Sequence, residues 1–238
     1  MLTNNKNNYK HIYKKINSNK KNFNKKDLSN IIKEIVNDKV CDDDEKAPNF
    51  GEILNKSDVK VEKNHIYFYT EVNSRSIFEL INAIKNLEYE MEFIKFDLNQ
   101  VYGYVIDPVI YLHINSGGGF LYDGFLGSDY ILQCKVKIIS IIDGFCASSA
   151  TLLSMSCQER WINKNSSILI HQLSGGCWGK FNEMEDNFKN SKKAQKKLVK
   201  FYQTFTSLNK EEINRWLKKD VEFSSTKCLS MGFVDKIL

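Results

Sequence analysis

The sequence lacks the spacings by which cysteines build metal sites or disulfide frameworks. Its six cysteines form no Cys-x-x-Cys pair, and none is spaced with a histidine as a zinc site requires. In a chain of 238 residues this pattern favours free thiols in a reducing compartment. No apolar run approaches the ~18 residues of a membrane helix, and no secretory signal pattern is present. We therefore expect a cytoplasmic or organellar protein with no metal, no cofactor and no membrane association.

Arginine is absent from the first 40 residues, which contain ten lysines, ten asparagines and only three acids. The net charge of +5 belongs to this segment and not to the remaining chain, so we expect no nucleic-acid binding by the folded body. Residues 1–57 are predicted to be a disordered Asn/Lys-rich extension with an acidic linker, apart from an amphipathic helix at Leu28–Val40. A transit peptide and a nucleic-acid tether are alternative interpretations of its lysines.

Residues 58–238 are predicted to form one α/β domain, because apolar strand patterns alternate with helical ones. We expect a parallel sheet covered on both faces. Asn73 or Ser74 is expected to cap the first helix, and 88–108 is interpreted as an insertion with an extra strand or hairpin. The predicted strands are 65–69, 109–114, 136–142 and 167–170, and the predicted helices are 76–87, 120–133, 148–157, 182–206 and 210–217.

A serine, a histidine and an aspartate occur in an order that fits a charge-relay system. Ser148 follows a strand and a glycine turn, His171 ends an apolar run, and Asp220 lies further on. A serine hydroxyl needs a base within hydrogen-bond reach, and the base needs a carboxylate that fixes its tautomer. The order Ser…His…Asp differs from those of the α/β-hydrolases, chymotrypsin and subtilisin, so these folds are disfavoured. The N–H of Ser149 and the turn 117–119 are natural oxyanion donors.

Each of these residues also has a structural interpretation. Ser148 can simply cap a helix, and His171 can be a strand-end histidine. The glycine run resembles a phosphate loop, but no Gly-Lys-Ser/Thr follows it. Cys146 is a rival nucleophile, yet two residues before the serine it should point away from the same pocket. His113 is interpreted as structural, and for His65 we expect no partner.

Four segments resemble successive signatures of one family: Ile114–Gly119, Gly144–Ser148, Ile170–Gly176 and Gly232–Asp235. They are similar, in order and spacing, to the proteolytic subunit of the caseinolytic protease, the ClpP family. The resemblance runs from about His65 to the C-terminus.

This resemblance implies a ClpP/crotonase-like stack of ββα units with a projecting handle, made of a strand at Gly175–Phe181 and the helix after it. It implies Ser148 as nucleophile, His171 as general base and Asp220 as its orienting partner. Gly118 and Gly119, with the N–H of Ser149, would form the oxyanion hole. The function implied is a serine endopeptidase that hydrolyses unfolded polypeptides inside two stacked heptameric rings. Its partners would be copies of itself, related ClpP-like subunits and an AAA+ unfoldase that uses the ATP.

The chain departs from the family pattern at several positions, and two alternatives remain beside the endopeptidase, although the presence of all three triad residues weighs against both. Lys218 and Lys219 stand where an acidic residue and an arginine are usual, which alters the expected contacts between rings. Gly117 stands where the family usually has proline, and Ser149 where it has methionine. The alternatives are a catalytically silent ring subunit and a crotonase-type acyl-CoA enzyme that would use the Gly119 region as its oxyanion hole.

Overall fold

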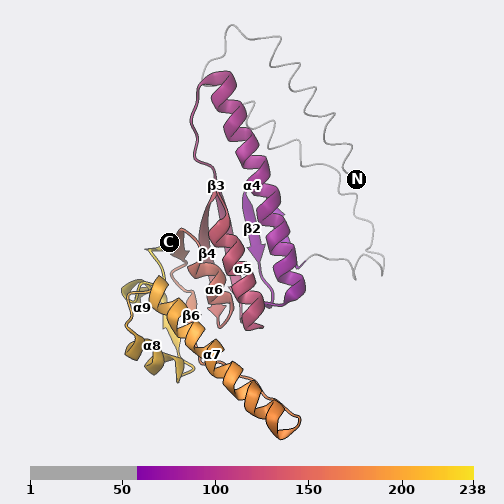
Figure 1. Cartoon of the computed structure of the whole chain (residues 1–238). Coiled ribbons are helices and arrows are strands. Elements are labelled where there is room, and N and C mark those ends of the chain that lie inside the picture. Colours follow the sequence, from indigo (N-terminus) through magenta and orange to yellow (C-terminus); the bar gives the residue numbers. More distant parts are fainter. Residues whose placement is uncertain (1–57) are drawn as a thin grey trace, which may run out of the picture. The chain divides into compact units, whose positions relative to one another are not determined.

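The computed structural model describes residues 58–238, and the predicted extension 1–57 with its helix lies outside them (Figure 1). The described elements are β1 (Val59–Glu62), β2 (His65–Phe68), α4 (Ser74–Tyr102), β3 (Val109–Ser116), α5 (Leu121–Gln133), β4 (Lys137–Ala147), α6 (Ala150–Met155), β5 (Glu159–Ile162), β6 (Ser167–Leu169), α7 (Phe181–Phe205), α8 (Lys210–Leu217), β7 (Glu222–Ser224), α9 (Ser225–Ser230) and β8 (Lys236–Ile237). None of these helices is apolar enough over a sufficient length to cross a bilayer.

The strands form one sheet in the order β1-β2-β3-β4-β5-β8, and β6 and β7 extend it from β4. The successive pairs β2–β3, β3–β4, β4–β5 and β5–β8 are parallel, and so is the pair β4–β6. The mixed α/β fold and the parallel centre are confirmed. The antiparallel pairs β1–β2 and β6–β7 were not predicted, because each depends on contacts between short strands.

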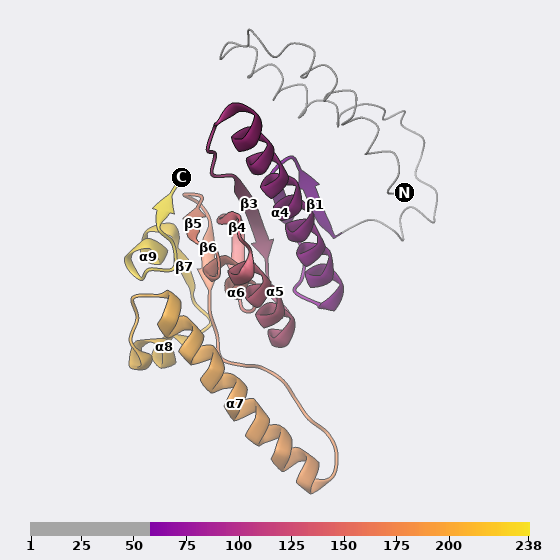
Figure 2. The ribbon, with the colours of Figure 1, turned by 45° about the horizontal axis from the view of Figure 1, so that its top comes forward.

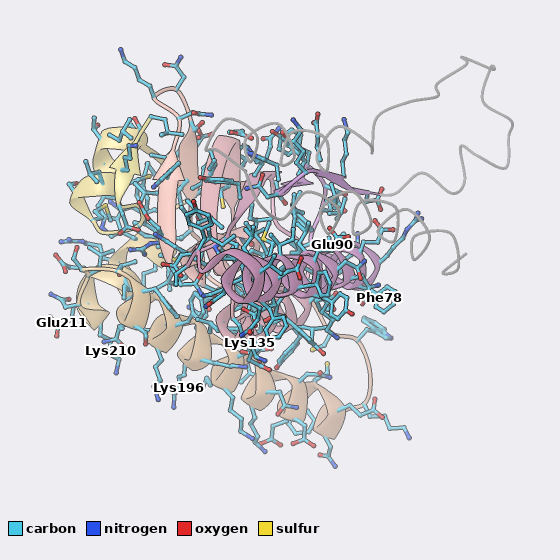
Figure 3. The ribbon with its side chains drawn as sticks, turned by 90° about the horizontal axis from the view of Figure 1, so that it is seen from above. Phe78, Glu90, Lys135, Lys196, Lys210 and Glu211 are labelled. Atoms are coloured by element: carbon cyan, nitrogen blue, oxygen red, sulfur yellow. The ribbon has the colours of Figure 1, made fainter. Side chains whose placement is uncertain are left out.

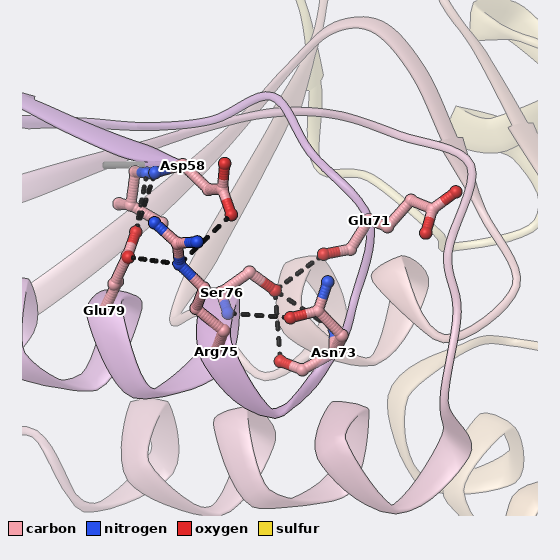
Figure 4. Close-up of polar contacts among 7 residues, drawn as sticks. Asp58, Glu71, Asn73, Arg75, Ser76 and Glu79 are labelled. Atoms are coloured by element: carbon pink, nitrogen blue, oxygen red, sulfur yellow. Dashed lines mark hydrogen bonds and ion pairs between the residues drawn. The ribbon is translucent and has the colours of Figure 1, made fainter. Parts of the chain in front are cut away.

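The start of α4 is fixed by the predicted cap, Asn73 (Figure 4). Its Oδ1 accepts a hydrogen bond from the N–H of Ser76 at 3.0 Å, and its own N–H donates to Ser76 Oγ at 3.0 Å. One turn later Glu79 accepts hydrogen bonds from the N–H groups of Asp58 and Val59. Satisfying these orphan donors stabilises the helix start and joins β1 to it.

The extra strand or hairpin predicted within 88–108 is wrong. Helix α4 continues to Tyr102 and ends at Gly103, whose φ of 68° is left-handed. Ile94 and Phe96 do alternate with polar residues, but both are exposed, so no buried strand face exists there. The segment 88–102 contains neither proline nor glycine, so nothing in it stops a helix that is already formed.

The two faces of the sheet are covered differently. Ile110, Leu112 and Ile114 of β3 are fully buried on one face, and α4, α5 and α6 lie on one side of the sheet (Figure 1). Tyr111 and His113 point to the opposite face and are only half-buried. Helices on both faces were expected, but α4, α5 and α6 all lie on the first face (Figure 1). On the second, which we call the open face because none of these three helices covers it, Ile139 and Ile141 of β4 are nevertheless buried.

The strand predicted at Gly175–Phe181 is also absent, although the long helix after it is present. Residues 170–180 have no regular structure, and Figure 2 shows them as an open loop that runs out to the start of α7. Trp178 in this loop is fully exposed. A strand needs a neighbour for its backbone hydrogen bonds, and the described part of the chain offers none here.

Candidate active site

Ser148 occupies a strained turn between β4 and α6. Its φ of 52° lies in the left-handed region, which residues other than glycine seldom adopt. Its N–H donates to the carbonyl of Leu169 at 2.9 Å, and its carbonyl accepts hydrogen bonds from the N–H and Oγ1 of Thr151, at 3.1 and 2.6 Å. These three bonds hold the turn in place. Strain of this kind is common at functional positions.

The glycine turn after β3 packs directly against this serine. A Cβ on Gly118 would lie 2.6 Å from Ser148 Cβ and 2.7 Å from the carbonyl oxygen of Ala147, and its φ is 95°. A Cβ on Gly119 would lie 2.1 Å from the carbonyl oxygen of Val72. Only glycine allows this close approach of two backbones, so the turn and the serine form one rigid unit.

Two of the three predicted oxyanion donors are free. In residues 58–238, the N–H groups of Gly119 and Ser149 make no hydrogen bond to the chain. The N–H of Gly118 instead donates to Ser116 Oγ at 3.2 Å. Free backbone N–H groups beside a serine are the arrangement that stabilises an oxyanion.

Ser148 opens into a cleft of about 340 Å³, a size typical of ligand sites. Its walls come from the glycine turn, the serine turn, the segment after β6 and helix α7. The lining residues are Gly119, Phe120, Leu121, Tyr122, Ser148, Ser149, His171, Gln172, Leu173, Ser174, Asn187, Asn190, Ser191, Ala194, Leu198 and Tyr202. The cleft therefore brings together four of the predicted site residues, which lie on three separate segments.

His171 lies in an irregular segment whose backbone is nevertheless held on two sides. The N–H of Gln172 donates to the carbonyl of Leu217 in α8 at 2.7 Å. The N–H of Leu173 donates to Gln195 Oε1 in α7 at 2.8 Å. Because both bonds follow the histidine directly, α7 and α8 set where its side chain starts.

Asp220 is not among the residues that line the cleft, but its backbone lies near His171. Strands β6 and β7 are antiparallel, with Leu169 opposite Glu222. Continued by two residues, this register sets His171 opposite Asp220. The carboxylate is exposed, and in the described residues no hydrogen bond joins the side chains of Ser148, His171 and Asp220.

Cys146 is excluded as the rival nucleophile, as predicted. Its side chain is fully buried, it does not line the cleft, and burial raises the pKa of its thiol far above the ordinary range. A thiol held protonated and away from solvent is a poor nucleophile.

A second group of titratable side chains lies on the open face of the sheet, and sequence reasoning missed it. His65 Nδ1 and His113 Nε2 are 2.9 Å apart, and His113 Nδ1 donates to Asp143 Oδ2 at 2.7 Å. Asp143 also accepts hydrogen bonds from the hydroxyl of Tyr69 and, at 3.0 Å, from Asn163 Nδ2. The prediction that His65 has no partner is therefore wrong. The alternation of β3, which sets His113 on this face, was the available signal.

The site and the sheet together define a class of protein, a mixed α/β fold with a strained serine at the carboxyl edge of a mostly parallel sheet. Residues 105–238 match the family described as Clp protease, which is more than half of the chain. The chain belongs to the Clp protease family.

Three relatives extend this result. One from Protochlamydia amoebophila, ATP-dependent Clp protease proteolytic subunit 1, is 28% identical over 135 residues, which are 55% of this chain and 65% of the relative. The ATP-dependent Clp protease proteolytic subunit of Deinococcus radiodurans is 30% identical over 131 residues, which are 54% of this chain and 64% of the relative. The ATP-dependent Clp protease proteolytic subunit 6, chloroplastic, of Arabidopsis thaliana is 25% identical over 131 residues, which are 54% of this chain and 48% of the relative. The chain thus spans less than two thirds of the length of each.

Proposed function

We propose that the chain is a serine endopeptidase with Ser148 as nucleophile, His171 as general base and Asp220 as the residue that orients it. The observation that carries the proposal is the cleft, where the strained Ser148 lies together with His171 and with the free N–H groups of Gly119 and Ser149. The names of the relatives support a proteolytic role.

In the proposed reaction, Ser148 Oγ attacks the carbonyl carbon of a peptide bond while His171 accepts the hydroxyl proton. The N–H groups of Gly119 and Ser149 would stabilise the negative oxygen of the tetrahedral intermediate, and loss of one such donor typically costs about 10²–10³ in rate. His171 then donates the proton to the leaving amine, and an acyl-enzyme remains on Ser148. A water molecule, activated by the same histidine, hydrolyses this ester.

The reaction requires the side chains of His171 and Asp220 to turn toward each other and toward Ser148. The backbones are suitably placed, because β4, β6 and β7 are adjacent and carry the three residues at or just beyond their paired segments. Rotamer changes of half-buried and exposed side chains are fast compared with turnover. The imidazole and the carboxylate can therefore join when a substrate or a neighbouring subunit fills the cleft.

We further propose that the substrates are unfolded polypeptides and that the subunits assemble into two stacked rings, alone or with related ClpP-like subunits. An AAA+ unfoldase would supply the substrate and use the ATP. Support comes from family membership and from the words "ATP-dependent" and "subunit" in the relatives' names. A cytoplasmic or organellar location fits this proposal, and one relative is described as chloroplastic.

A catalytically silent ring subunit is the second candidate, and one observation favours it. The side chains of His171 and Asp220 form no hydrogen bond with each other in the described residues. A crotonase-type enzyme is less favoured, because its oxyanion hole would not need a serine in a strained turn.

A fluorophosphonate probe and a short fluorogenic peptide distinguish these candidates. The endopeptidase should be labelled at Ser148, and Ser148→Ala should abolish both labelling and hydrolysis. Ser230→Ala, which changes an exposed serine in α9, serves as the control and should leave both unchanged. Absence of labelling in the assembled wild-type protein would instead support the silent subunit.

A further inference from the structure

A second groove joins the candidate active site on the side of α7 and α8. It shares Gln172, Leu173 and Ser191 with the cleft that contains Ser148, so a bound chain can run from one into the other. The full lining is Gln172, Leu173, Phe188, Ser191, Lys192, Gln195, Asn214, Leu217 and Lys218. Nothing in the proposed reaction uses this groove.

The charged groups of the groove are all cationic. Lys192 and Lys218 line it, no acid does, and within residues 58–238 neither lysine has an acidic partner. Lys192 lies over the ring of Phe188, with its Nζ 4.3 Å from the ring centroid. The ring holds the lysine stem at the groove while leaving the ammonium group without a counter-ion.

The acids nearest the groove do not line it. No aspartate or glutamate occurs from residue 187 to residue 210, and Glu211 and Glu212 lie in the first turn of α8, outside the lining. One turn before the groove, Glu185 and Asp186 are both occupied by Lys189, at 3.1 and 3.6 Å. Asp220 is the nearest acid along the chain to Lys218, and the proposed function assigns it to His171.

The groove is also coupled mechanically to the candidate base. Gln195 lines it and accepts the hydrogen bond from the N–H of Leu173, two residues after His171. Leu217, another lining residue, accepts the hydrogen bond from the N–H of Gln172. A substrate group seated here would press on the two contacts that fix the backbone beside the histidine.

We infer that this groove binds an acidic side chain of the substrate, a few residues from the scissile bond on one side, through Lys192 and Lys218. The inference rests on the proposed function, for which it names a preferred class of substrate. A carboxylate gives charge-assisted hydrogen bonds to two ammonium groups, whereas a neutral or basic side chain leaves them unpaired. The same chemistry would also hold the free C-terminus of a peptide.

Binding to the inactive Ser148→Ala protein tests the groove without any need for hydrolysis. The probes are fluorescent peptides, acetylated and amidated so that no terminus is charged, with one position scanned as Glu, Gln or Lys on either side of a fixed centre. We expect the Glu peptide to bind about fivefold more tightly than the Gln peptide at one side only. A second form of the Gln peptide carries a free C-terminal carboxylate in place of the amide. Tighter binding of this form than of the amidated form would show that the groove binds the C-terminus of a peptide.

Charge reversal identifies the two lysines. In the Ser148→Ala background, Lys192→Glu with Lys218→Glu should remove the preference for Glu and create one for Lys, which also shows that the variant is folded. Lys200→Glu is the matched control, because Lys200 is an exposed lysine of the same helix that lies two turns after Lys192 and outside the groove. A glutamate placed at Lys196 (Figure 3), four residues after Lys192, would instead pair with that lysine. The Lys200→Glu control should keep the preference for Glu. Equal binding of the three peptides, or loss of the preference in the control alone, would overturn the inference.

Hydrolysis by the wild-type chain separates this inference from the proposed function. The Glu peptide should show a lower KM at a similar kcat, and added salt should reduce the difference. Acid-selective binding without any hydrolysis would defeat the endopeptidase and leave the groove standing. Hydrolysis with equal KM for the Glu and Gln peptides would overturn the inference about the groove and leave the endopeptidase proposal intact.

Discussion

The two histidine-containing regions of this chain contrast in what surrounds the imidazole. On the open face of the sheet, His113 is hydrogen-bonded on both ring nitrogens, to His65 and to Asp143. In the cleft, His171 makes no hydrogen bond to Ser148 or Asp220 within the described residues, yet it shares a cavity with a strained serine. The first region has a complete chain of acid and bases without a nucleophile. The second has a nucleophile and free N–H donors without the chain.

If Ser148 is the nucleophile, as proposed, a formed Asp–His pair is a poor guide to the active site of this chain. On the sheet face, Asp143 accepts three hydrogen bonds and fixes the tautomer of His113, which stabilises the end of the network. An imidazole that must receive and return a proton needs room to move. The better guide is the backbone: a left-handed Ser148 beside a glycine turn.

Replacing the two aspartates separately is the sharpest test of this contrast and should give the largest effect. Asp220→Asn is expected to lower kcat by about 10³–10⁴, because the amide favours the wrong tautomer of His171. Its unfolding temperature should stay unchanged, since the Asp220 carboxylate is exposed. Hydrolysis of a fluorogenic peptide and thermal unfolding measure the two quantities.

The second aspartate should behave in the opposite way. Asp143→Asn removes a charged acceptor of three hydrogen bonds and should cost about 1–3 kcal/mol of the free energy of unfolding. Labelling of Ser148 should persist. If Asp143→Asn abolished labelling while the protein stayed folded, or if Asp220→Asn were fully active, the assignment of the two regions would be reversed.

The rigidity of the serine region is tested by adding one methyl group. Gly118→Ala would set a Cβ 2.7 Å from the carbonyl oxygen of Ala147 at a φ of 95°. We expect a loss of about 2–4 kcal/mol in the free energy of unfolding, from strain and overpacking. Gly175→Ala in the loop before α7 meets no atom within 4 Å and should change it by less than about 0.5 kcal/mol. Denaturant unfolding measures the free energy of unfolding of both variants. Equal losses would contradict the conclusion that the serine region is rigid and the loop before α7 is not.

The parts that the sequence predicts are those that depend on local pattern. The cap at Asn73, the strand at 109–114 and the position of Cys146 outside the cleft all follow from neighbours along the chain. The assignments of Ser148 and His171 came from motif order and stay predictions, although the structure sets both residues in one cleft.

The parts that failed depend on partners far along the chain. His65 meets His113 only because β2 and β3 pair in one register, with His65 opposite Tyr111. The strand at Gly175–Phe181 was expected from the family resemblance alone, and this segment has no strand to pair with in the described residues. The alternation of apolar and polar residues in 94–98 predicted a strand, but this segment lies within a helix that begins at Ser74. The helix continues through it because no helix-ending residue occurs there.

The polar contact between α6 and α7 gives a smaller expected effect and links the serine turn to the helix that also carries the groove. Thr151 Oγ1 lies 2.8 Å from the buried hydroxyl of Tyr202 and donates to the carbonyl of Ser148. Thr151→Val leaves that hydroxyl without a partner, which should cost about 1–3 kcal/mol. Adding Tyr202→Phe should restore part of this loss, because no buried hydroxyl then remains unpaired. Denaturant unfolding of the single and double variants measures both, and full additivity of the losses would contradict the link.

The dependence of stability on pH should give the smallest effect, and it belongs to the sheet face. Burial lowers the pKa of His65 below its ordinary value of 6.5, and repulsion from His113 and Lys63 adds to this, while Glu62 opposes it. A lowered pKa means that the unfolded chain binds the proton more tightly than the folded chain. Stability is therefore complete above pH 6.5 and falls as the pH drops below it toward the folded pKa. Between pH 7.5 and 5.5 the wild type should lose about 1–3 °C more in Tm than His65→Gln. His171→Gln is the control and should keep the wild-type slope; if it were this variant that flattened the slope, the titrating group would lie in the cleft instead.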